Sequence, residues 1–153
     1  MEVGEWMLED KKGLSLFQMI AVVYCIGYGM YSLWRGAYWV FFADKVASES
    51  PLYMAMHQII SLFWWGMPFL IAGILLMIAG LMVPYYKANN YFLYLFTIGH
   101  IISMVFYYIF TLAGFHNAIN ILTPGQNLTW AVISGVMAFI GGVSLWNQKT
   151  MKK

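Results

Sequence analysis

The sequence predicts an all-α integral membrane protein, in which four transmembrane helices form an antiparallel bundle with both termini in the cytoplasm. Hydrophobic residues make up 62% of the 153-residue chain and charged residues only 9%, whereas a soluble domain is about 45–50% apolar and about 25% charged. No acidic residue follows Glu49, and Lys87 is the only charge between residues 50 and 148. A bilayer crossing needs about 20 apolar residues, so this region has room for several crossings.

The same composition excludes three other classes of protein. A net charge of +2 with no basic run outside the ends is too small for a nucleic-acid binder. Cys25 is the only cysteine, which excludes a disulfide scaffold. An aromatic content of 19% is incompatible with intrinsic disorder.

The four predicted spans cover residues 14–33, 61–83, 92–114 and 128–146 of one domain, residues 1–153. Their apolar runs are continuous and lack two-residue alternation, which favours helices over barrel strands. Pro84 and the polar residues after it end the second span. Residues 123–127, with Pro124 and Gly125, predict a turn before the fourth span. The connection over residues 35–52 begins with apolar residues, so we expect it to lie at the interface or over the mouth of the bundle.

The distribution of cations predicts the orientation. Arg35 and Lys45 fall on one predicted side of the membrane. Six lysines fall on the other side, together with both termini: Lys11, Lys12, Lys87, Lys149, Lys152 and Lys153. Cytoplasmic loops carry the excess of Lys and Arg, so we expect both termini in the cytoplasm of a prokaryotic cell.

Small residues recur at intervals that place them on one helix face. Gly66, Gly73 and Gly80 are spaced by seven residues in the second span, as are Gly29 and Gly36 in the first. Seven residues are about two helical turns. Such faces permit close helix packing in lipid, so they predict contacts within the chain, with docking of another subunit as the alternative.

Polar residues form a row on each of two spans. The first span carries Cys25 and Ser32, with Tyr28 and Arg35 on the adjoining row. The third span carries four such residues at spacings of three or four: His100, Ser103, Tyr107 and Thr111. Unpaired polar groups are costly in lipid, so both rows should face inward. They would form either a hydrogen-bonded seam or a narrow cavity for a lipid-like molecule or a quinone.

Histidines are the best candidates for chemistry. His100 lies within the third span, and with Tyr107 it is the candidate for binding a cofactor, either a quinone or haem b. The alternative is a neutral His100 that hydrogen-bonds a Tyr or Ser. Near the other face, Asp44, His57 and His116 have the ligand types of a copper or zinc site, although their spacing is not that of a known motif.

Two apolar segments resemble the DoxX/DoxD-like family of small four-helix membrane proteins. These are residues 29–36 (GMYSLWRG) in the first span and residues 73–81 (GILLMIAGL) in the second. The resemblance extends from about residue 27 to residue 104. Family members include the membrane subunit of a thiosulfate:quinone oxidoreductase, so the resemblance implies a membrane subunit linked to a redox complex.

The leading functional hypothesis is therefore a small accessory subunit of a larger membrane complex, such as a quinone-linked or metal-dependent oxidoreductase. Its partners would be lipids and other transmembrane subunits, without nucleic acid. The shortage of catalytic groups favours a non-catalytic role, because no carboxylate lies beyond Glu49. Two alternatives stay open: a self-contained redox protein that uses His100, and a small carrier or channel.

Overall fold

The computed structural model describes residues 14–85 and 90–151, which form helices joined by short connections. Four of these helices are long and apolar enough to cross a membrane. They are α1 (Leu16–Phe41), α4 (Leu62–Met82), α5 (Tyr91–Asn117) and α6 (Leu122–Met151). Two shorter helices, α2 (Ala43–Ala47) and α3 (Pro51–Ile59), connect α1 to α4, and the 3-10 turn η2 (Val83–Tyr85) extends α4.

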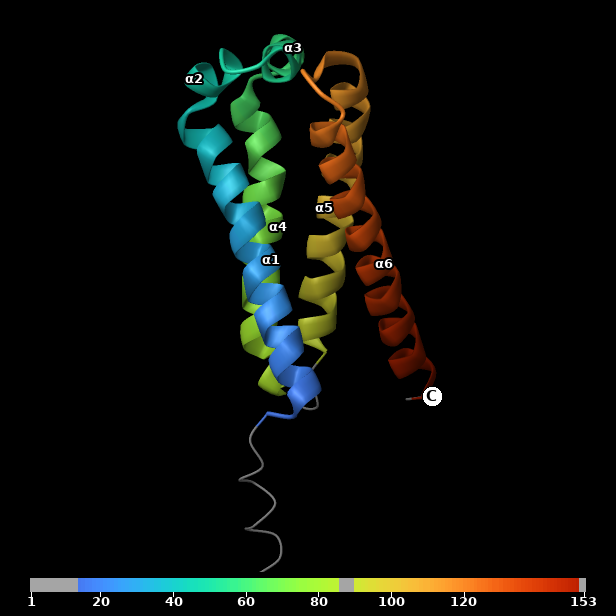
Figure 1. Cartoon of the computed structure of the whole chain (residues 1–153). Coiled ribbons are helices and arrows are strands. Elements are labelled where there is room, and N and C mark those ends of the chain that lie inside the picture. Colours follow the sequence, from blue (N-terminus) through green and yellow to red (C-terminus); the bar gives the residue numbers. More distant parts are fainter. Residues whose placement is uncertain (1–13, 86–89, 152–153) are drawn as a thin grey trace, which may run out of the picture.

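The long helices pack as successive antiparallel neighbours, α1 with α4, α4 with α5, and α5 with α6. Figure 1 shows α1 and α4 side by side, with α5 and α6 as a second pair. The start of α1 and the end of α6 lie at one end of the bundle, and α2, α3 and the α5–α6 connection lie at the other. The predicted all-α antiparallel bundle of four spans is thus confirmed.

Local sequence explains where the helices begin. Ser15 and Gln18 form a capping box at the start of α1, in which each side chain bonds the backbone of the other residue. Ser50 caps α3 ahead of Pro51, which occupies the first helical position, where its missing N–H costs nothing. Ser61 caps α4 after the extended residue Ile60, so α3 and α4 are separate helices.

The helices α1 and α6 extend well beyond the first and fourth predicted spans, and the turn predicted at residues 123–127 was wrong. α1 continues to Phe41, because the apolar segment after Gly36 extends the helix and does not begin a connection. α6 begins at Leu122, so the turn predicted at residues 123–127 is helical. Proline is tolerated in the first turn of a helix, where Pro124 lies. The chain turns earlier, at residues 118–121, and Asn120 Oδ1 accepts a hydrogen bond from Leu122 N at 3.1 Å.

Glycines set the close approach of α1 to α4. A Cβ added to Gly73 would lie 2.7 Å from the carbonyl oxygen of Gly29, and one added to Gly36 would lie 2.8 Å from that of Gly66. The heptad glycines of the first two predicted spans therefore face each other within the chain, as small residues do where helix backbones approach closely.

The contacts between α1 and α6 are of a different kind. These two helices are not close neighbours along their backbones, and they are joined by long side chains across the space between them. The Tyr28 hydroxyl hydrogen-bonds Ser134 Oγ, and Arg35 Nη1 donates to Asn127 Oδ1 at 2.8 Å. This side of the bundle contains the candidate site.

Candidate anion-binding recess between α1 and α6

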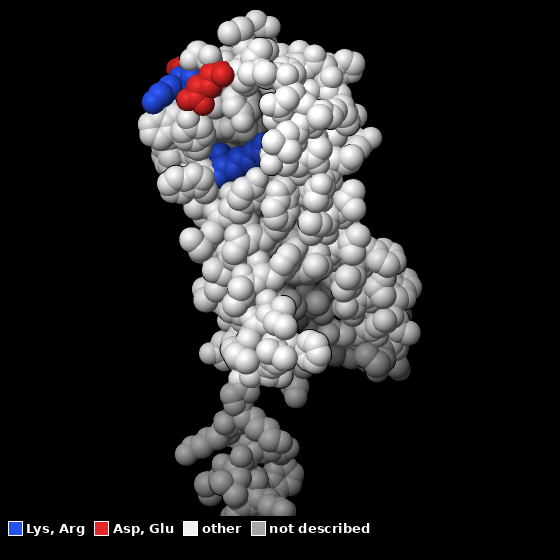
Figure 2. All heavy atoms as spheres, in the orientation of Figure 1, with Lys and Arg blue, Asp and Glu red and all other residues white. Residues whose placement is uncertain are grey.

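A recess opens between α1 and α6 near the end of the bundle that α2 and α3 cover. Its volume is about 330 Å³, and α1, α3 and α6 contribute its lining. Figure 2 shows a basic surface inside a hollow on this face, separate from the charged groups at the end of the molecule. Arg35 is the basic residue among those that line the recess.

The guanidinium of Arg35 is surrounded by aromatic rings from three helices. Its Cζ atom lies 4.8 Å from the ring centroid of Trp39 on α1. The corresponding distance is 5.3 Å for Phe69 on α4, and 5.2 and 5.3 Å for Tyr107 and Phe110 on α5. Each distance is within the roughly 6 Å over which a ring attracts a cation. The rings thus stabilise the charge and fix its position.

The rings are themselves rigidly packed. Trp39 stacks on Phe110 with centroids 4.5 Å apart, and it meets Phe69 edge-on at 5.5 Å. Trp39, Phe69 and Phe110 are almost completely buried. Aromatic pairs in these geometries are worth about 0.5–1.5 kcal/mol beyond their buried area. Arg35 is consequently held against a fixed wall and does not extend away from the bundle.

Arg35 has no acidic partner in the described parts of the chain. Asp44 and Glu49 are the acids there; Asp44 pairs with His57, and Glu49 Oε1 accepts a hydrogen bond from the Tyr38 hydroxyl at 2.8 Å. A guanidinium has five N–H donors, and Asn127 Oδ1 accepts from one of its nitrogens. Aromatic rings offer neither a countercharge nor a conventional acceptor. The recess therefore presents an uncompensated cation.

A further donor lies beside this cation without a partner. Asn127 lines the recess and is 2% exposed, and its Nδ2 atom has no hydrogen-bond partner among the described residues. Buried polar groups are nearly always hydrogen-bonded. An unmet donor next to an uncompensated guanidinium suits an acceptor such as a carboxylate or phosphate.

The depth of Arg35 is intermediate. It precedes the end of α1 at Phe41 by six residues, which is about 9 Å at a rise of 1.5 Å per residue. A charge at the centre of a bilayer is far more costly than one near the interface. Arg35 thus lies between the end and the middle of α1, where a charge is less costly than at the centre of a bilayer.

The predicted cofactor residues are both buried in the core. His100 on α5 packs between rings, with centroid distances of 4.5 Å to Phe96, 5.1 Å to Tyr28 and 5.8 Å to Tyr24. Neither of its ring nitrogens has a hydrogen-bond partner among the described residues, so the expected bond to a Tyr or Ser is not formed. Tyr107 lies apart from it, beside Arg35. Cofactor binding by His100 and Tyr107 stays a prediction.

The predicted metal ligands come together only in part. His57 Nε2 lies 3.8 Å from Asp44 Oδ1, and His57 Nδ1 accepts a hydrogen bond from Leu62 N at 3.4 Å. His116 is exposed near the end of α5. No group of three metal-ligating side chains occurs within residues 14–85 and 90–151. A copper or zinc site at these residues stays a prediction, with His57 and Asp44 as the pair that is in contact.

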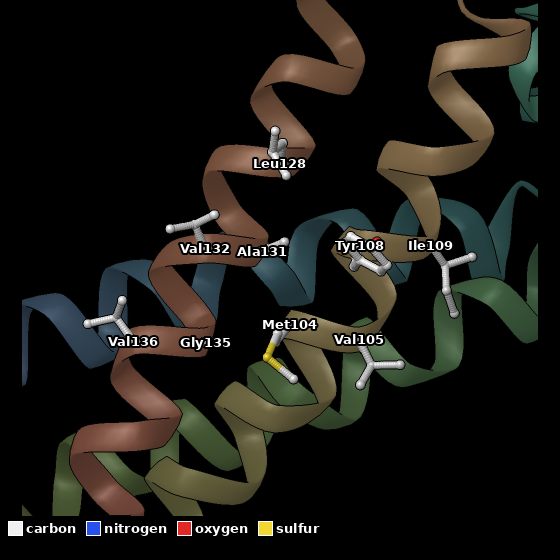
Figure 3. A pocket seen from close by; sticks show the side chains of 9 residues that line it. All are labelled: Met104, Val105, Tyr108, Ile109, Leu128, Ala131, Val132, Gly135 and Val136. Carbon is white, nitrogen blue, oxygen red and sulfur yellow. The ribbon is translucent and has the colours of Figure 1, made fainter.

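A second hollow lies on another face, between α5 and α6, with a volume of about 500 Å³. Figure 3 shows its two walls, formed by Met104, Val105, Tyr108 and Ile109 on α5 and by residues 128–136 on α6. Ala131 and Gly135 line its α6 side. This hollow is apolar, unlike the recess.

Sequence reasoning placed Arg35 on the row of Tyr28, but it missed the partners of Arg35. Asn127 was assigned to a turn, and no spacing in the sequence links Trp39, Phe69 and Phe110 to one guanidinium. The available signal was a single cation directly after a long apolar run.

In comparisons with known proteins, no family model, no curated protein and no solved structure matches this chain.

Proposed function

We propose that the protein binds an anionic amphiphile of the membrane, with the anionic head in the recess beside Arg35. One observation carries the proposal: a guanidinium held by four aromatic rings, without an acidic partner in the described residues, that lines an open recess between α1 and α6. An anion there would supply the missing countercharge. It would also accept a hydrogen bond from the unmet donor of Asn127.

The chemistry of the recess suits the binding of an anion. Its lining combines Arg35 with aromatic side chains, two amides and a threonine. A guanidinium is well suited to recognise a carboxylate or phosphate. The role that fits is recognition, transport or storage of a membrane amphiphile.

The test compares Arg35→Gln with Lys45→Gln in the full-length protein reconstituted in lipid nanodiscs. Lys45 is a matched control, because it is a cation at the same end of the bundle that does not line the recess. Hexadecanoate with bromine on its second carbon serves as the probe. Bromine quenches nearby indole fluorescence, and Trp34 and Trp39 line the recess.

Charge-assisted hydrogen bonds contribute about 1.5–3 kcal/mol, and 1.4 kcal/mol is a factor of ten in affinity. Arg35→Gln should therefore weaken binding about 10- to 100-fold, and Lys45→Gln should leave it unchanged. Hexadecanol, which has no charge, should compete poorly. Equal binding by wild type and Arg35→Gln would reject the proposal.

A second candidate function, as an accessory subunit of a larger membrane complex such as an oxidoreductase, is favoured by the apolar hollow between α5 and α6. Its lining is apolar on both helices, as expected for a surface that meets a helix of another subunit in the membrane. Purification from native membranes in mild detergent tests this candidate. A stable monomer without a co-purifying membrane protein would contradict it.

The proposed orientation has the recess on the outer side of the membrane and both termini in the cytoplasm. It is supported by the excess of lysines toward the ends of the chain. Labelling of Ser48→Cys and Thr150→Cys, each in a Cys25→Ser background, tests it with an impermeant maleimide. Ser48→Cys should react in intact cells and Thr150→Cys only after permeabilisation; the reverse pattern would invert the orientation.

A further inference from the structure

A second, apolar groove lies beside the recess, between α1 and α6. It has a volume of about 290 Å³, and Tyr31 lines both the groove and the recess. Its other lining residues come from α1, except for one from α6: Val23, Tyr24, Gly27, Tyr28 and Trp130. The two hollows thus share a wall, with the charged group in one and an almost entirely apolar lining in the other.

Gly27 leaves open space in this groove. A Cβ added there would meet nothing within 4 Å, whereas one added to Gly29 or Gly36 would collide with α4. The packing of α1 on α4 therefore explains Gly29 and Gly36 but does not explain Gly27. Gly27 precedes Arg35 by eight residues, which is about 12 Å along the helix axis. The groove consequently extends from Tyr31, one turn from Arg35, toward Val23.

We propose that the ligand carries an unbranched alkyl chain, which lies in this groove over Gly27 while the anionic head binds Arg35. This inference rests on the proposed function and names the class of ligand: a long-chain alkyl carboxylate or phosphate monoester. Its support is that the charged recess and the apolar groove adjoin at Tyr31, in the same order as the polar and apolar parts of such a molecule. Tyr31 and Trp130, whose rings lie 5.1 Å apart, bridge α1 and α6 beside the chain.

Substitutions that fill the groove distinguish the contribution of the alkyl chain to binding from that of the anionic head. Gly27→Leu places a side chain in the open space, and Gly27→Ala is the matched small substitution. Val23→Phe is a second variant that narrows the groove; Val23 is 71% exposed on the lipid-facing side, so this change does not depend on repacking of the core.

The experiment measures binding of hexadecanoate and octanoate by competition with the brominated probe, in nanodiscs of one lipid composition. Partition into the lipid is then the same for every variant. The ratio of the hexadecanoate and octanoate affinities therefore measures how much the groove contributes to binding of the alkyl chain. We expect Gly27→Leu and Val23→Phe to lower the preference for hexadecanoate at least fivefold, and Gly27→Ala to change it less than twofold. Octanoate should still require Arg35.

The outcomes distinguish this inference from the proposed function. If Arg35→Gln weakens binding but neither groove variant alters the preference for chain length, the chain does not lie in the groove and the inference falls. If Arg35→Gln has no effect, the proposed function fails first. The affinities for hexadecanoate and hexadecyl phosphate are then compared. The acid that binds more tightly identifies the anionic head, as that of a fatty acid or of a phosphate monoester.

Discussion

The contact between α1 and α4 makes a quantitative prediction for Gly73→Ala. The added methyl would lie 2.7 Å from the Gly29 carbonyl oxygen and from Leu33 N, and 2.8 Å from Leu33 Cβ. Ordinary contacts begin at 3.4 Å, so the methyl is too close by 3.4 − 2.7 = 0.7 Å. Two of these obstacles are backbone atoms, which cannot rotate away. The two helices must separate to make room.

Overpacking of a well-packed core costs about 1–3 kcal/mol, and backbone obstacles favour the upper part of that range. Alanine has a higher helix propensity than glycine by about 1 kcal/mol. The net effect of Gly73→Ala should be a loss of about 1–2 kcal/mol in the free energy of unfolding. Gly27→Ala is the control, because the same propensity gain applies there without any collision.

The assay is unfolding in mild detergent by titration with sodium dodecyl sulfate, followed by tryptophan fluorescence. Gly73→Ala should unfold at a lower fraction of the denaturing detergent than wild type, and Gly27→Ala at the same or a higher fraction. If both alanine variants match each other, the proposed approach of the α1 and α4 backbones through glycine is refuted.

Four further substitutions test other parts of the bundle in the same assay. Tyr28→Phe and Ser134→Ala, combined in a double-mutant cycle, should show a coupling free energy of about 0.6 kcal/mol, which is typical of interhelical hydrogen bonds in membranes. If the effects of the two substitutions on the free energy of unfolding are additive, the hydrogen bond between α1 and α6 is contradicted. Trp39→Ala removes the ring that stacks on Phe110 and should lower the free energy of unfolding by about 3–5 kcal/mol. A decrease of less than about 1 kcal/mol would contradict the described packing. His100→Phe should stay within about 1 kcal/mol of wild type, because neither ring nitrogen has a partner among the described residues; a Soret absorption band that this variant loses would instead identify His100 as a haem ligand.

The helices that contain the second and third predicted spans begin and end close to the bounds of those spans, because polar or proline residues flank them in the sequence. The cap at Ser61 and the residues before Tyr91 mark the starts of α4 and α5, and Pro84 marks the end of α4. The helices that contain the first and fourth predicted spans are longer than those spans. Proline at the third position of α6 was taken for a turn, although a helix tolerates proline in its first turn.

The candidate site was predictable only in part. Periodicity placed Tyr28 and Arg35 on an inward row of α1, and both contact α6 in the structure. The four rings around Arg35 come from three helices, separated by up to 71 residues of sequence. Helical periodicity determines which residues share a face, but not which faces of different helices meet. The ring cluster therefore required the tertiary structure.

The measurement that tests the account most directly is native mass spectrometry of the protein released from its own membrane. Wild type should carry one bound mass that matches a long-chain alkyl carboxylate or phosphate monoester, and Lys45→Gln should retain it. Arg35→Gln should lose this mass while it keeps the helical circular dichroism of wild type. Identical bound masses on wild type and Arg35→Gln, or none on wild type after addition of hexadecanoate and hexadecyl phosphate, would contradict an anion-binding recess at Arg35.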